Sequence, residues 1–228
     1  MYSDIRLGRS DIAFDPTGSG MSDEDFVDAV MGDIGTIVTT AQGRALLRDL
    51  AYGDVDGRSH RTTIGYVETP EDAGGISEGP LDPQDLVDGD GVGIRIAYHP
   101  GADVDLGRSS RNFEQDDWAR MTSDVAFFHE LVHAWHQHEG NVEGTVDWKG
   151  RVTLPKVTSQ ERGPLTQDDL NAPREEWRTV GIGPYADEPY SENAYREERA
   201  AVTGTDIPPR DSYRGFGRRD VAGPKPGG

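Results

Sequence analysis

The chain has 228 residues and a formal net charge of −19, an acidic balance that argues against nucleic acids and anionic membranes as partners. Cysteine is absent, which excludes disulfides and thiolate ligands, so a metal site would have to use histidine, aspartate and glutamate. No apolar run is long enough to insert into a membrane, and the first residues do not form a basic-then-apolar signal peptide.

The N-terminal part predicts one strand and two helices. Residues 5–14 alternate loosely between apolar and polar side chains, which is typical of a strand. Ser22 is a good helix N-cap, and the acids that follow it suit the positive end of a helix dipole. Gly32 and Gly35 are expected to weaken or break this helix. A second helix is expected from about Thr40.

Two further strands are predicted at residues 61–67 and 93–98, where β-branched and aromatic side chains gather. The segment 70–91 between them is acidic and rich in glycine and proline, so we expect a solvated loop. Its Asp88-Gly89-Asp90-Gly91 run lacks the glutamate and the fuller ligand series of an EF-hand loop and is not taken as a calcium site.

The stretch from Phe127 to His136 contains one His-Glu-x-x-His motif. On an α-helix, side chains four residues apart lie on one face, so His129 and His133 can hold one metal ion, and Glu130 is directed toward a water beside it. An apolar stripe at helical spacing runs beside this face. A catalytic zinc site takes three protein ligands and leaves the fourth position open. The motif therefore predicts a zinc site that still lacks one ligand.

The third ligand has two candidates on predicted later helices. Pro173 is placed to begin one helix, which carries Glu176. Ser191 is placed to cap another, which opens with Glu192. Composition and spacing leave the choice between the two glutamates open.

A third histidine is not expected to complete the site. The metzincin pattern fails, because Glu139 occupies the position of its last histidine. His136 and His138 are expected at the exposed end of the zinc-site helix. Gly140 is a natural C-terminal stop, and a short hairpin is expected around residues 146–157.

Four blocks occur in an order that resembles a known family: residues 128–134, the Glu-Glu-Trp-Arg-Thr-Val-Gly stretch at 175–181, Ser191-Glu192-Asn193, and Arg210-x-x-Tyr213. They look like the NleD-like effector metallopeptidases of bacterial pathogens and, more distantly, the light chains of clostridial neurotoxins. The resemblance covers roughly residues 93–215. The spacing between blocks differs, and no counterpart of the neurotoxins' extended substrate-binding regions is visible.

The resemblance implies a role for each matched residue. Glu176 matches the zinc-binding glutamate, while Glu192 and Glu175 would support the site from behind the ligands. Arg210 and Tyr213 match a pair that contacts the reacting carbonyl and would stabilise the oxyanion. Glu130 would act as the general base.

We therefore expect an α+β, compact zincin-like metallopeptidase domain at residues 1–214, with a small mixed sheet packed on the zinc-site helix, and a flexible tail at 215–228. The expected activity is that of a zinc-dependent endopeptidase that cleaves a protein substrate, as a toxin or effector. Strand 94–98 is the candidate edge strand, along which an extended substrate would lie by strand addition. Such a protein would be soluble, secreted or delivered into a target cell, and an inhibitor or immunity protein would be a further partner. The alternatives are a zinc amidase or other non-peptide hydrolase, and a non-catalytic zinc-bearing module of a larger toxin.

Overall fold

The computed structural model describes residues 1–53, 60–72, 74–78, 82–105, 120–146, 152–156, 173–204 and 207–210. The described helices are α1 (Tyr2–Arg6), α2 (Asp23–Ile37), α3 (Ala41–Tyr52), α4 (Ser123–His138), α6 (Arg174–Val180) and α7 (Glu192–Thr203). The described strands are β1 (Ile12–Asp15), β2 (Thr62–Tyr66), β3 (Gly74–Glu78), β4 (Gly93–Tyr98), β5 (Val104–Asp105), β6 (Arg120–Met121), β7 (Thr145–Val146) and β8 (Val152–Thr153). Short 3-10 turns lie at Pro70–Asp72, Pro83–Leu86 and Gly183–Tyr185. This mixture of helices and a small sheet confirms the predicted α+β class.

The main sheet has the strand order β1-β2-β4-β3. β1, β2 and β4 are parallel, and β3 pairs antiparallel with β4. Along β4 the buried side chains are Ile94, Ile96 and Tyr98, and the residues between them are partly exposed. Because strand side chains alternate between the two faces, one face of the sheet joins the core and the other faces outward. On the outward face, Arg95 donates to Asp15 at 2.5 Å.

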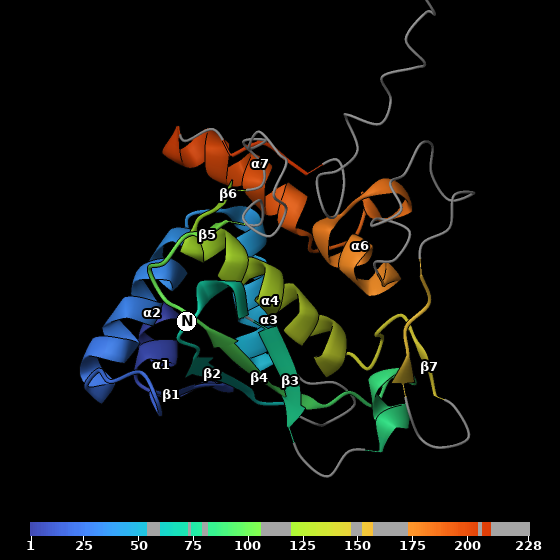
Figure 1. Cartoon of the computed structure of the whole chain (residues 1–228), viewed down its shortest axis with the longest axis horizontal. Coiled ribbons are helices and arrows are strands. Elements are labelled where there is room, and N and C mark those ends of the chain that lie inside the picture. Colours follow the sequence, from blue (N-terminus) through green and yellow to red (C-terminus); the bar gives the residue numbers. More distant parts are fainter. Residues whose placement is uncertain are drawn as a thin grey trace, which may run out of the picture.

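Helix α4 crosses the middle of the molecule, with the sheet on one side and α6 and α7 on the other (Figure 1). Its two faces are buried against different partners. Phe127 stacks on Tyr98 of β4, with ring centroids 4.2 Å apart, and Phe128 stacks on Tyr195 of α7 at the same separation. Burying aromatic rings on both sides fixes α4 in position, so the side chains that it projects are held on a rigid element.

Side-chain caps and a glycine define several helix ends, two of them at the predicted caps Ser22 and Ser191. The side chains of Ser22, Thr40 and Ser191 accept hydrogen bonds from first-turn amides of α2, α3 and α7. Gly181 ends α6 in the left-handed conformation, with φ of 80°. Gly32 and Gly35 do not break α2, because its buried residues on the opposite face hold the helix against the core.

Three expectations about the N-terminal half are wrong. The segment 5–14 is not one strand, since Tyr2–Arg6 forms α1 and only Ile12–Asp15 pairs with β2. The segment 70–91 is not a plain loop, because residues 74–78 pair with β4 as β3. In consequence β4 has a neighbour on each side and is not an edge strand. The edge next to it is β3.

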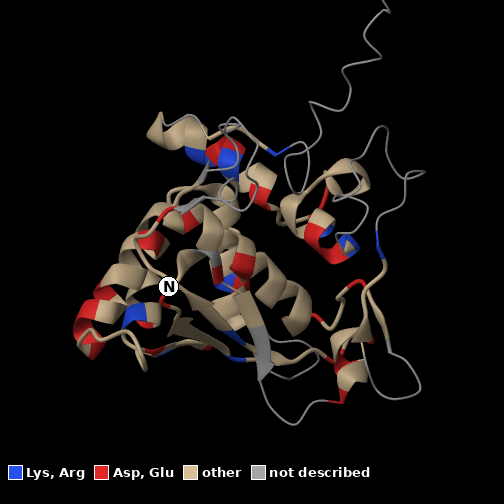
Figure 2. Cartoon of the chain, in the orientation of Figure 1, with Lys and Arg blue, Asp and Glu red and all other residues tan. Residues whose placement is uncertain are grey.

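The first turn of α2 carries the acidic residues that were expected at the positive end of a helix dipole, Asp23, Glu24 and Asp25 (Figure 2). No helix within the described ranges is long and apolar enough to cross a membrane. Residues 147–151 and 157 of the expected hairpin lie outside the described part, but its strands β7 and β8 pair antiparallel. The predicted boundary between residues 214 and 215 also lies outside it.

Candidate metal centre and active site

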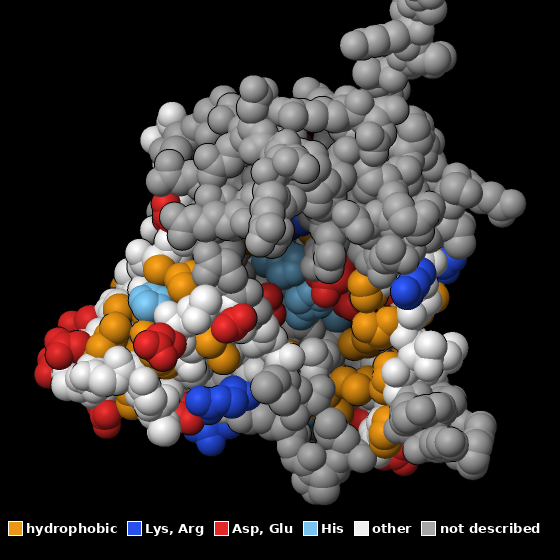
Figure 3. Space-filling view, in the orientation of Figure 1, with side chains coloured by type: hydrophobic (Ala, Val, Ile, Leu, Met, Phe, Trp, Pro, Cys, Tyr) orange, Lys and Arg blue, Asp and Glu red, His pale blue; other side chains and the backbone are white. Residues whose placement is uncertain are grey.

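Helix α4 projects His129 and His133 toward α6. Val125, Phe128 and Val132 are fully buried on the core side of the same helix, so the helical period turns the motif to the other side. Nε2 of His129 lies 3.2 Å from Nε2 of His133. Figure 3 shows histidine side chains gathered in a hollow of the molecular surface, with acidic side chains beside them.

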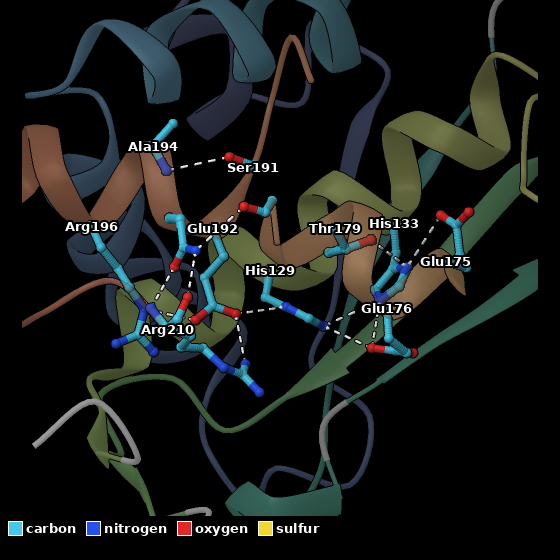
Figure 4. Close-up of polar contacts among 12 residues, drawn as sticks. His129, His133, Glu175, Glu176, Thr179, Ser191, Glu192, Ala194, Arg196 and Arg210 are labelled. Carbon is cyan, nitrogen blue, oxygen red and sulfur yellow. Dashed lines mark hydrogen bonds and ion pairs between the residues drawn. The ribbon is translucent and has the colours of Figure 1, made fainter. Parts of the chain in front are cut away.

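Glu176 of α6 completes this group. Its Oε2 lies 3.4 Å from Nε2 of His129 and 3.4 Å from Nε2 of His133 (Figure 4). Pro173 begins α6 and Gly181 ends it, so Glu176 belongs to the first turn of a short helix that is fixed at both ends.

The three facing atoms form a nearly equilateral triangle with sides of 3.2, 3.4 and 3.4 Å. For a tetrahedral zinc ion with bonds of about 2.05 Å, neighbouring ligand atoms are about 3.3 Å apart. The donor set of two imidazoles and one carboxylate is also a common one for catalytic zinc. The residues present therefore fit a zinc ion, and Glu176, not Glu192, supplies the third facing atom.

Glu192 of α7 lies behind His129. Its Oε2 is 2.9 Å from Nδ1 of His129, so with Nε2 turned toward Glu176 the imidazole donates its Nδ1 proton to this carboxylate. Arg196 donates to Oε1 of Glu192 at 2.6 Å and Arg210 donates to Oε2 at 3.0 Å. Glu192 and Arg196 have no exposed surface, and Arg210 is 4% exposed. A buried carboxylate between two guanidinium groups thus fixes the orientation of His129.

His133 is supported by α6. Thr179 Oγ1 lies 3.2 Å from its Nδ1, and Glu175 Oε1 lies 3.8 Å from the same nitrogen. The buried carboxylate of Glu175 also accepts from Nδ1 of His136 and from the amide of Glu143 at 2.9 Å. Thr179 was not among the predicted site residues. Thr179 lies four residues after Glu175, on the same face of α6, and this spacing could have predicted its role.

His136 and His138 are not exposed, which corrects the expectation for the end of α4. His136 has no exposed surface and packs beside Glu175, while His138 is 6% exposed and faces Thr62 Oγ1 at 3.2 Å. The residues around Gly91 cover the C-terminal end of α4, where the amide of Val92 donates to the carbonyl oxygen of Gln137. The prediction failed because it assumed that the last helical turn had nothing packed on it.

The charges of the site shift several pKa values. Burial alone would lower the pKa of His133, but the charge of Glu176 and hydrogen bonds to Glu175 and Glu176 raise it well above its usual value. Burial opposes ionisation of Glu176, yet the facing histidines hold its pKa well below the usual range. Burial likewise opposes ionisation of Glu192, but the charges of Arg210 and Arg196 lower its pKa. The carboxylates are therefore ionised at neutral pH and present acceptors to a cation.

Glu130 is partly exposed and lies close to the edge strand. A Cβ atom placed on Gly75 of β3 would be 3.8 Å from Oε2 of Glu130. Glu130 thus faces the space between α4 and β3, where a bound peptide could reach it. Tyr213 lies outside the described residues, so its predicted contact with the reacting carbonyl stays a prediction.

Two other groups of metal-binding side chains occur in the described part of the chain. His133, His136 and Glu175 lie close together, but Glu175 already accepts from His136. Asp85, Asp88 and Asp90 form a partly exposed acidic group in the segment where the sequence showed only a faint calcium-like pattern. The first group is not equally spaced, because Oε1 of Glu175 lies 3.8 Å from Nδ1 of His133 and hydrogen-bonds directly to Nδ1 of His136.

Comparison with protein families gave one finding that bears on this site. A family model, Peptidase_M91, described as effector protein, matches residues 15–213. The match begins at the end of β1 and includes α4, α6 and α7, which carry the residues of the site. Comparison with curated proteins found no match.

Proposed function

The chain belongs to the Peptidase_M91 effector family, as the resemblance to NleD-like bacterial effector metallopeptidases predicted, and on that premise we propose that it is a zinc-dependent endopeptidase. The observation that carries the proposal is the triangle of His129, His133 and Glu176, whose sides of 3.2–3.4 Å match the edges of a zinc tetrahedron. When bound there, zinc would lower the pKa of a water molecule and polarise a carbonyl group.

Glu130 would be the general base. Its carboxylate takes a proton from the attacking water and delivers it to the amine that leaves when the peptide bond breaks. Its place beside the triangle, one residue after His129, and its partial exposure support this role. Glu192 and Thr179 hold the imidazoles of His129 and His133, each by accepting the Nδ1 proton, and so keep both Nε2 atoms turned to the metal position.

The burial of Arg210 favours a role other than the predicted contact with the oxyanion. Its guanidinium contacts Glu192 and is almost fully buried, so we propose that it positions His129 through that carboxylate. Direct contact with the oxyanion remains the proposed role of Tyr213. Glu175 positions α6 by bonding to His136 and to the segment at Glu143.

The substrate would be a protein segment in extended conformation that adds to the sheet along β3. This strand is the edge of the sheet and its residue Gly75 lies beside Glu130, both of which favour an open peptide cleft over the enclosed pocket of an amidase. Cleavage would be internal. Delivery into a target cell and an inhibitor or immunity partner stay predictions.

The test uses the purified chain, its Glu130→Gln variant and Glu197→Gln as a control that changes an exposed glutamate of α7. Each is incubated with cell extract, with and without chelator, and new protein termini are mapped. We expect about one zinc per chain in all three proteins and metal-dependent termini from the wild type and the control only. Glu130→Gln should lose roughly 100- to 10,000-fold in rate. Full activity of Glu130→Gln, or activity that survives metal removal, would contradict the proposal. Turnover of small amides without new protein termini would instead indicate the amidase.

A further inference from the structure

Helix α6 supplies the third facing atom of the metal triangle, yet its apolar side chains lie outside the main core. They form a separate buried cluster of Trp177, Val180 and Ile182, with Tyr185 packed against it. This cluster holds α6 and the turn after it together as one unit. Because apolar packing is not directional, the place of Glu176 relative to the two histidines depends on directed polar bonds between this unit and α4.

Glu143 makes three bonds to the α6 unit. Its Oε1 accepts from Nη1 of Arg174, at the start of α6, at 3.3 Å. Its Oε2 accepts from the hydroxyl of Tyr185, in the turn after α6, at 2.6 Å. Its backbone amide donates to Oε2 of Glu175 at 2.9 Å. One residue thus contacts the beginning of α6, its first turn and the segment beyond its end.

Glu143 is itself fixed to the end of α4. It lies on the segment that follows this helix, where the amide of Asn141 donates to the carbonyl oxygen of His136 at 3.1 Å. On the other side, the amide of Val142 donates to the 3-10 turn at Pro83–Leu86, with a distance of 3.0 Å. The segment therefore connects α4, which carries the histidines, to the unit that carries Glu176.

We infer that Glu143 is a positioning residue: it fixes α6 against the end of α4, so that the Glu176 carboxylate faces His129 and His133. Its described bonds are to α6 and to the turn after it, so it acts through the helix. The inference rests on the proposed function, because it concerns the third ligand of the same zinc site.

The metal site tolerates little movement of α6. Oε2 of Glu176 lies 3.4 Å from each histidine Nε2, and ligand atoms around tetrahedral zinc are about 3.3 Å apart. Metal–ligand distances vary by only about 0.2 Å, and a site that is about 1 Å too loose loses its function. A small shift of α6 on α4 would therefore remove the third ligand while both histidines stay in place.

The experiment measures zinc affinity by competition with a chromogenic chelator. Glu143→Ala should weaken zinc binding by about 10- to 100-fold, the range for residues that support a ligand. Glu143→Gln keeps an oxygen that can accept from Tyr185 and should lose less. Glu188→Ala is the matched control and should keep the wild-type affinity. Glu188 also pairs with an arginine of α6, Arg178, at 3.2 Å and is similarly exposed, but it follows the turn after α6 and belongs to the same unit.

Two further readouts separate positioning from a general loss of stability. In hydrogen exchange with chelator present, Glu143→Ala should speed exchange of the α6 amides and leave those of β4 at wild-type rates, because the two belong to separate hydrophobic clusters. In the Glu176→Gln background the ligand that Glu143 positions is already lost. There Glu143→Ala should weaken zinc binding by a smaller factor than in the wild type.

A second variant covers the case in which Glu143→Ala does not fold. Tyr185→Phe removes only the hydroxyl that donates to Glu143. It should weaken zinc binding by about 2- to 10-fold, which is the effect of one hydrogen bond.

The outcomes distinguish the inference from the function on which it rests. Absence of zinc binding by the wild type would refute the proposed endopeptidase and this inference together. If the wild type binds zinc and produces metal-dependent termini, wild-type affinity in Glu143→Ala, or in Tyr185→Phe, would overturn the inference alone. So would an equal loss of affinity in Glu188→Ala, faster exchange in β4 as well as in α6, or an undiminished effect of Glu143→Ala in the Glu176→Gln background.

Discussion

Replacing Glu192 by glutamine should reveal the difference between supporting the metal site and binding the metal. The Glu192 carboxylate is fully buried and faces Nδ1 of His129 at 2.9 Å, Nε of Arg196 at 2.6 Å and Nη1 of Arg210 at 3.0 Å. Removing one partner of a buried ion pair costs about 3–5 kcal/mol, because the remaining charge loses its compensation away from water. We therefore expect Glu192→Gln to lower the free energy of unfolding of the metal-free protein by about 3–5 kcal/mol.

Glu176→Gln is the matched variant. The Glu176 side chain is 24% exposed, and its described ion pairs are with His129 and His133. Its loss should lower the unfolding free energy of the metal-free protein by less than the loss of Glu192 does, because water still reaches the Glu176 carboxylate. Loss of a residue behind a metal ligand costs about 10- to 100-fold in affinity, and loss of the ligand itself costs more. Of the two variants, Glu176→Gln should thus have the lower affinity for zinc. Glu192→Gln should have the lower free energy of unfolding without metal.

Two measurements at pH 8 test this pair. Urea unfolding followed by tryptophan fluorescence in the presence of chelator gives the stabilities, and competition with a chromogenic zinc chelator gives the affinities. If Glu192→Gln loses the metal while Glu176→Gln retains it, Glu192 is the ligand and the site must be redrawn. Equal urea midpoints for the two variants would show that the buried carboxylate does not hold the two arginines.

Three further outcomes are expected. His129→Ala and His133→Ala should each abolish the binding of one zinc per chain, measured by metal analysis, and full zinc content in both would refute the assignment. Thr179→Val removes the hydroxyl that faces His133 and should weaken zinc binding by about tenfold in a chelator competition. Thr179→Ser should keep the wild-type affinity. Equal zinc affinities of Thr179→Val and the wild type would exclude a role of Thr179 in holding His133. Burial, followed by the charge of His60, lowers the pKa of His138 to about 4. Between that value and about 6.5 the unfolded chain binds the proton and the folded chain does not, so stability should fall by about 3 kcal/mol from pH 7 to pH 4. His138→Gln should remove this part of the pH dependence in urea unfolding, and an unchanged slope would contradict it.

The helix of the metal site could be predicted from the sequence because its signals are local. The spacing of His129 and His133 places both on one helical face, whatever the helix packs against. The caps at Ser22 and Ser191 act within three residues of themselves and were predicted correctly, and the start of a helix near Thr40 was also predicted. The order of four blocks also led to the family, although no single block after the first is specific.

The edge of the sheet could not be predicted, because strand order is a property of long-range pairing. Residues 93–98 have the composition of a strand in either position, interior or edge. The pairing of β3 with β4 makes β4 an interior strand. β3 is short and glycine-rich and has no clear alternation, so it becomes a strand only because β4 offers it free backbone groups. The burial of His136 and His138 was hidden for the same reason, since Glu175, which packs on His136, and the segment around Gly91, which packs on His138, are both far away in the sequence.

Residue types and local spacing establish which side chains can carry the chemistry: a helix with two histidines and a base, and two later glutamates. The places of these side chains depend on how the helices pack. Glu192 meets His129 across 63 positions of chain, on the Nδ1 side, while Glu176 meets the same ring on the Nε2 side. An imidazole has two nitrogens that point in different directions, and the packing of α6 and α7 on opposite ends of α4 settles which carboxylate each nitrogen faces. That choice depends on the directions of whole helices, which no local spacing encodes.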